Sequence, residues 1–89
     1  MKKLLEHQEL IKQATFYNSE AIRCAMAINS CRSTLVDISK DLSMPQATRD
    51  LHESHYTDEL NKAMAEKHIA LNKYADCLRK LVEEIIPEP

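Results

Sequence analysis

Residues 10–42 contain the pattern that decides the fold, LIKQATFYNSEAIRCAMAINSCRSTLVDISKDL. Apolar residues recur in this stretch at alternating spacings of four and three, which is the 3.5-residue repeat of helices that pack against other helices. We call these ten positions the first stripe: Leu10, Ala14, Tyr17, Ala21, Cys24, Ile28, Cys31, Leu35, Ile38 and Leu42. The stripe predicts a helix over about residues 3–41, roughly 60 Å long at 1.5 Å per residue.

The composition predicts that the rest of the chain is helical too. The 89 residues include no glycine, and the three prolines are Pro45, Pro87 and Pro89. Because proline disfavours helical geometry at the preceding residue but suits the first turn of a new helix, we expect a turn at about residues 42–45. The sequence therefore predicts an all-α protein: a single domain over residues 1–89, folded as a long antiparallel helical hairpin that self-associates into a helical bundle.

The second half of the chain permits two interpretations. Thr57 is followed by Asp58 and Glu59, which resembles a helix N-cap with acidic residues in the first turn. We therefore predict a short middle helix over about 46–54 and a longer helix over about 57–86, ended by Pro87, with one continuous helix as the alternative. A second stripe is predicted on the last helix: Leu60, Met64, Leu71, Tyr74, Ala75, Leu78, Leu81, Val82 and Ile85.

The totals argue against several classes of protein. Hydrophobic residues make up 44 % of the chain, which is too apolar for a disordered tail. The longest apolar run, residues 24–28, is far too short to cross a membrane. The net charge is −2 and the basic residues are not concentrated on one face, so nucleic acid is not the expected partner. Three cysteines, an odd number, favour a reducing compartment, and we expect a cytoplasmic protein.

Two groups of residues could form a metal site or act in catalysis. His52, His55 and Glu59 could share one side of a helix as metal ligands, although the histidines are three apart and zinc proteases use a spacing of four. Lys67 interrupts the second stripe, and a lysine among apolar neighbours can act as a nucleophile. A lysine stem lying along the stripe, with its ammonium in water, is the commoner arrangement. We therefore predict no catalytic residue, no cofactor and no metal, and the roles of these four residues stay open.

The middle of the first helix is apolar beyond the first stripe. Residues 21–28 are apolar on nearly all sides, and Val36 continues the face formed by Ile22 and Met26. Helices of this kind are buried on several sides, so we predict an interface with another chain, with an internal contact to residues 46–54 as the alternative. The predicted interface residues are Tyr17, Ala21, Ile22, Cys24, Ala25, Met26, Ile28, Cys31, Leu35 and Val36.

These observations predict a non-enzymatic protein–protein interaction module. Such a chain would act as an adaptor, assembly factor or inhibitor that binds a larger protein through helix faces, as small phage- or plasmid-type regulators do, and we expect it to form a homodimer. The first alternative is a small regulatory nucleic-acid-binding bundle, which would need Lys12, Arg23, Arg32 and Lys40 on one basic surface. The second is a small helical-bundle enzyme, which would need several cationic side chains converging inside the bundle.

Overall fold

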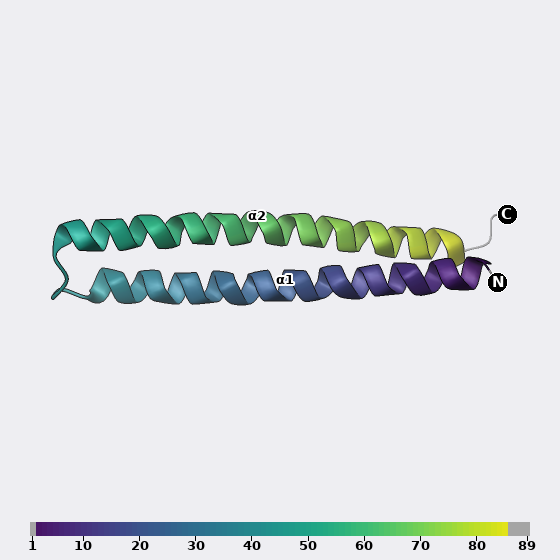
Figure 1. Cartoon of the computed structure of the whole chain (residues 1–89), viewed down its shortest axis with the longest axis horizontal. Helices are drawn as coiled ribbons and strands as arrows, with labels where there is room; N and C mark the ends of the chain where they lie inside the picture. The colour runs from purple at the N-terminus through teal and green to yellow at the C-terminus, as the bar shows by residue number, and fades with distance from the viewer. Residues whose placement is uncertain (1, 86–89) are drawn as a thin grey trace.

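The protein is a two-helix antiparallel hairpin. The computed structural model describes residues 2–85, and within them helix α1 spans Lys2–Lys40 and helix α2 spans Gln46–Ile85. The two helices lie side by side along their whole length, so that residues 2 and 85 are at the same end of a body of 67 × 20 × 15 Å (Figure 1). The part of the chain that the structure describes contains no strand. The predicted all-α helical hairpin is confirmed.

The turn between the helices covers residues 41–45, close to the prediction. The carboxylate of Asp41 accepts hydrogen bonds from the Ser43 hydroxyl (2.5 Å) and the Ser43 backbone N–H (3.1 Å). These bonds, that of the hydroxyl above all, stabilise the ionised form and lower the pKa of Asp41 below its ordinary value. Leu42 was predicted as the last buried position of the first stripe, and this is wrong. The helix ends at Lys40, so Leu42 lies in the turn and is 86 % exposed.

Arg49 holds the turn against the start of α2. Its Nη2 donates hydrogen bonds to the backbone carbonyl oxygens of Asp41 (2.9 Å) and Met44 (3.2 Å), and both bonds are partly buried. The Arg49 backbone N–H also donates to the carbonyl oxygen of Pro45 (2.9 Å), which is the first hydrogen bond of the α2 ladder. One side chain thus satisfies two carbonyl groups that the turn leaves without helical partners.

We predict that Arg49→Met destabilises the protein. The methionine keeps much of the apolar stem but removes the two charge-assisted hydrogen bonds to the turn and a longer one to Gln46 Oε1 (3.4 Å), so the free energy of unfolding should fall by about 1–3 kcal/mol. Urea unfolding followed by circular dichroism measures this change. Arg79→Met is the control, because Arg79 forms only an exposed ion pair with Asp76 (2.8 Å) and should change stability by less than about 1 kcal/mol. Equal losses in the two variants would contradict the role of Arg49.

Helix α2 is continuous, so the predicted break at residues 54–57 does not exist and residues 46–54 are not a separate helix. The alternative of one continuous helix is the one that the structure adopts. An N-cap residue must leave helical geometry, and no glycine or proline near Thr57 forces the backbone to do so. Moreover, Glu53, Tyr56 and Leu60 are half-buried at spacings of three and four, which continues a single α1-facing stripe through the expected break.

The core is a thin seam of small side chains between the helices. Tyr17, Leu35, Leu60, Tyr74 and Leu81 are half-buried along its edges. Small residues at the centre of the contact let two helix backbones approach closely. The buried residues are Ala14, Ala21, Cys24, Ile28 and Ile38 of α1, and Ala63, Ala70 and Cys77 of α2. The nine remaining positions of the first stripe are therefore buried or half-buried against α2 of the same chain.

The second stripe was predicted on the wrong face of α2. Leu60, Tyr74 and Leu81 do face α1, but the other large members of that stripe are exposed, because the residues buried at the centre of α2 are small. The exposed members are Met64, Leu71, Ala75, Leu78 and Val82. The side chain of Ile85, the predicted helix end at residue 86 and the stop at Pro87 lie outside the residues that the structure describes.

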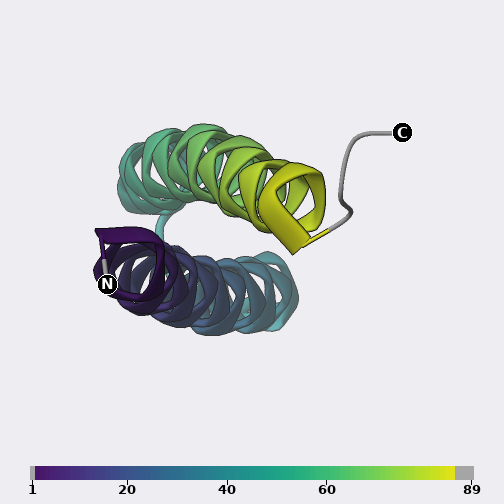
Figure 2. The same cartoon turned by 90° about the vertical axis from the view of Figure 1, so that its right-hand side faces the viewer.

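Cross-helix contacts fix the register of the hairpin from its open end to its middle. These pairs are His7 Nε2 with a Glu84 carboxylate oxygen (2.8 Å), the Cys77 thiol with Gln13 Oε1 (3.9 Å), and Arg23 Nη2 with a Glu66 carboxylate oxygen (3.7 Å). Viewed along the length of the hairpin, α1 and α2 lie side by side, and no other segment of residues 2–85 lies on either flank (Figure 2).

Candidate protein-interaction surface

The ten predicted interface residues separate into three groups in the structure. Those buried under α2 are Ala21, Cys24 and Ile28, and those half-buried beside it are Tyr17, Ala25, Cys31 and Leu35. Only Ile22, Met26 and Val36 point away from the seam, and Met26 is 68 % exposed. We call these three residues the outward line. Most of the predicted residues are therefore covered by an internal contact with α2. Arg23 lies opposite Glu66, so this contact involves α2 residues well beyond 46–54.

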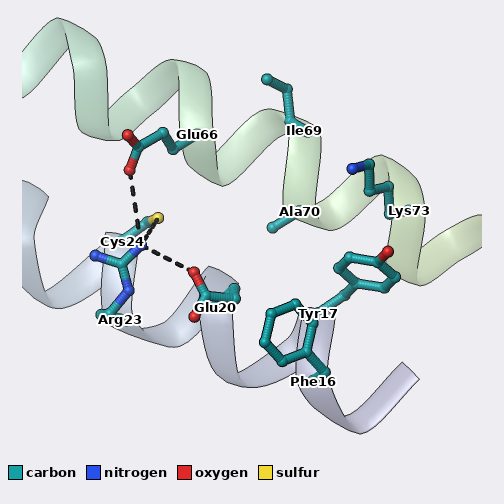
Figure 3. A pocket seen from close by; sticks show the side chains of 9 residues that line it. All are labelled: Phe16, Tyr17, Glu20, Arg23, Cys24, Glu66, Ile69, Ala70 and Lys73. Carbon is teal, nitrogen blue, oxygen red and sulfur yellow. Dashed lines mark hydrogen bonds and ion pairs between the residues drawn. The ribbon is translucent and has the colours of Figure 1, made fainter. Parts of the chain in front are cut away.

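One flank of the hairpin, which we call the paired side, carries charges that are satisfied within the chain. Arg23 forms ion pairs with Glu20 (2.9 Å) and, across the seam, with Glu66 (3.7 Å) (Figure 3). The hydrogen bond with Glu20 raises the pKa of Arg23 above its ordinary value. Lys73 places its ammonium 5.5 Å from the centre of the Tyr17 ring. The cations that line this flank thus already have partners.

The opposite flank, which we call the groove, is lined by apolar, uncharged polar and basic side chains, and no acidic residue of the described chain lines it. It consists of two hollows between α1 and α2, of ≈ 400 Å³ nearer the turn and ≈ 220 Å³ nearer the open end. The first is lined by Ala25, Ile28, Asn29, Arg32, Met64, Lys67, His68 and Leu71. The second is lined by Ile11, Ala14, Thr15, Asn18, Tyr74, Leu78 and Leu81. No carboxylate lines either hollow, so the groove and the paired side differ in their chemistry.

The basic residues of the groove have no acidic partners in the described part of the chain. Arg32, Lys67 and His68 line the hollow nearer the turn, and within residues 2–85 none of them forms an ion pair. Lys67 occupies a position of the α1-facing stripe of α2 and is half-buried, whereas Arg32 and His68 are exposed. The lysine that the sequence marked as an interruption thus contributes a cation to a largely apolar groove.

This groove was not predicted from the sequence. Lys67 was expected to interrupt the second stripe, Arg32 was required only by the nucleic-acid alternative, and His68 was not singled out. A usable signal was present: the four-and-three spacing can be followed backwards from Leu81 through Lys67 as far as Glu53. In that register Met64, Leu71 and Leu78 each come directly after a buried small residue. They therefore share one flank of the seam.

The structure also places the other residues considered for chemistry. His52, His55 and Glu59 are exposed, and the His55 ring packs edge-on against Tyr56 at 5.0 Å. Among the residues described, no group of three or more His, Cys, Asp or Glu side chains is close enough to hold a metal ion. Arg23 and Arg32, two of the four residues required for a basic surface, line opposite flanks of the hairpin.

Comparisons with known proteins add no relative to this description. No protein-family model, curated protein or solved structure matches the chain. Over the residues described, neither helix has an apolar segment long enough to cross a membrane. A functional proposal therefore depends on the surface of the hairpin itself.

Proposed function

We propose that the chain is a non-enzymatic protein–protein interaction module, an adaptor, assembly factor or inhibitor that presents helix faces to a larger protein. The observation that carries this proposal is the outward line. Ile22, Met26 and Val36 are about half or more exposed on α1, and the residues between them on this face, Asn29 and Ser33, are small and uncharged. Apolar surface that a small monomer leaves open commonly marks an interaction site.

The total surface of the hairpin supports association with another chain. The hairpin exposes 6924 Å², whereas a compact monomer of 10.2 kDa exposes about 5300 Å². The excess, about 1600 Å², is twice the area of roughly 800 Å² that one partner buries in an interface of standard size. We therefore include self-association into a homodimer in the proposal. The three cysteines are free thiols, which supports a reducing, cytoplasmic location.

The two alternatives have less support. A nucleic-acid-binding bundle requires a continuous basic surface, but Arg23 is engaged by Glu20 and Glu66 on the paired side, away from Arg32. An enzyme requires groups that act on a substrate in an enclosed site, and the cations of the groove lie in an open channel along the hairpin. No specific observation favours either function over protein binding.

We predict that Met26→Glu abolishes association through the outward line. A carboxylate placed in an apolar contact without a basic partner loses its hydration, so binding to the protein captured by the wild-type chain should fall at least tenfold, roughly the cost of one unpaired charge. Affinity capture from the native host and light scattering at micromolar concentration measure binding and self-association, and circular dichroism should show unchanged helicity.

Leu51→Glu is the matched control, because Leu51 is an equally exposed apolar residue on α2, away from the outward line. It should leave both capture and size unchanged. Capture of the same partner by Met26→Glu and wild type would contradict the proposed surface, and unfolding of Met26→Glu would show that this face belongs to the core. A wild-type monomer with full helicity would contradict self-association alone.

A further inference from the structure

The groove combines an apolar floor with basic side chains that no acidic residue balances. Ile11, Met64, Leu71 and Leu78 are each about half exposed along it, and all of them flank the buried seam on the same side. Arg32, Lys67 and His68 are gathered in the hollow nearer the turn. Exposed apolar surface favours an apolar occupant, and the unbalanced cations favour one that carries carboxylates.

The shape of the groove fits a helix. Its two hollows, lined by residues 11–18 and 25–32 of α1, together span about 30 Å at 1.5 Å per residue, which matches a helix of about 20 residues. A third helix laid between two antiparallel helices buries its own apolar stripe against both of them, as in helical bundles. Within residues 2–85, Figure 2 shows no segment other than α1 and α2 on either flank.

We propose that the groove is the docking site for an amphipathic helix of a protein partner, with acidic residues concentrated in the half that lies nearer the hairpin turn. This rests on the proposed function, since it names the chemistry of a bound protein. It concerns other side chains than the outward line, and Asn29 lies at the border between the two surfaces. The apolar stripe of the partner covers Met64, Leu71 and Leu78, and its flanking carboxylates pair with Arg32, Lys67 and His68.

A second copy of the chain is a poorer occupant of the groove. Groove-to-groove pairing would bring Arg32 and Lys67 to the interface twice, and no carboxylate among the described lining residues would meet them. Juxtaposed like charges disfavour an interface.

Two synthetic helical peptides test the proposal with the full-length chain. Both are about 21 residues long, with leucine at the stripe positions. One carries glutamate at the flanking positions and its twin carries lysine there. Fluorescence anisotropy of the labelled peptides at moderate salt should show the acidic peptide binding about tenfold more tightly than its basic twin, because two to three partly exposed ion pairs replace repulsion. The difference should shrink as salt is raised.

Charge reversal in the groove should reverse the preference. In the double variant Arg32→Glu with Lys67→Glu, the basic peptide should bind more tightly than the acidic one. The matched control is Lys62→Glu with Lys80→Glu. These lysines are seven residues from Ile69 and Lys73, which line the paired side, so the control changes the same number of charges on the opposite flank. It should keep the preference for the acidic peptide.

Several outcomes would overturn the proposal. Equal binding of the two peptides to the wild-type chain would do so without any variant, so the test does not depend on the folding of the charge-reversed protein. A milder variant, Arg32→Gln with Lys67→Gln, that is fully helical and keeps the full preference would also do so. If Leu71→Glu dissolves a wild-type dimer, a second copy occupies the groove. In each of these cases the proposed function would still be supported if Met26→Glu abolished capture of the protein partner.

Discussion

Replacing Ile28 with alanine should lower the free energy of unfolding by about 2–4 kcal/mol, the cost of a cavity left by a buried aliphatic side chain. Ile28 is 6 % exposed and, with Ile38, is one of the only two large aliphatic side chains among the buried residues described. The rest of the buried seam consists of alanine and cysteine. For an 89-residue chain, whose total stability is of the order of 4–13 kcal/mol, this loss is a large fraction. Urea unfolding followed by circular dichroism measures it.

Ile22→Ala is the matched control for Ile28→Ala. It makes the same chemical change in the same helix, but Ile22 is 53 % exposed and points away from the seam. Its truncation should cost less than about 1 kcal/mol, because little apolar area returns to water and no cavity forms. If Ile22→Ala destabilised the hairpin as much as Ile28→Ala, the outward line would be part of the core.

Ala70→Glu should destabilise the hairpin by about 2–5 kcal/mol, because a carboxylate at this buried position loses much of its hydration. Ala70 is 6 % exposed and faces the buried part of α1. The larger side chain also forces apart two helices that approach closely at small residues, which adds the cost of overpacking. The expected result is a lower midpoint of thermal unfolding and a smaller free energy of unfolding, both measured by circular dichroism.

Ala75→Glu provides the comparison for Ala70→Glu. Ala75 was predicted to lie in the second stripe, but it is exposed in the structure, so the same substitution should leave the hairpin folded and change its stability by less than about 1 kcal/mol. The two variants distinguish the observed orientation of α2 from the predicted one. Unfolding of Ala75→Glu with a stable Ala70→Glu would mean that the helix is rotated toward the predicted stripe.

The first helix and the turn were predictable because their signals are local and unopposed. From Leu10 to Ile38 one apolar residue occupies each core position, and no second apolar line of equal strength competes with it. Pro45 restricts the residue before it and therefore places the turn to within one or two residues. Leu42 was assigned to the core because periodicity alone cannot show that the helix has already ended at Lys40.

The orientation of α2 was not predictable in the same way. Two lines run next to each other on this helix: a small one through Ala63, Ala70 and Cys77, and a bulky one through Met64 and Leu71. Hydrophobicity favours burial of the bulky line, and that preference produced the misplaced stripe, whereas the expected break at Thr57 came from its resemblance to an N-cap. The alternating spacing of four and three also fits the small line, but it requires a charged residue, Lys67, at one of the positions that face α1.

The sequence by itself determined that the chain forms long helices, where the turn lies, and which face of the first helix is buried. These features follow from backbone preferences and from a periodicity that each helix carries alone. Only the tertiary structure decided which face of α2 meets α1, because that choice depends on how closely two particular surfaces can pack. By rotating α2 onto its small residues, the packing leaves Met64, Leu71 and Leu78 exposed and brings Lys67 into the same groove as Arg32.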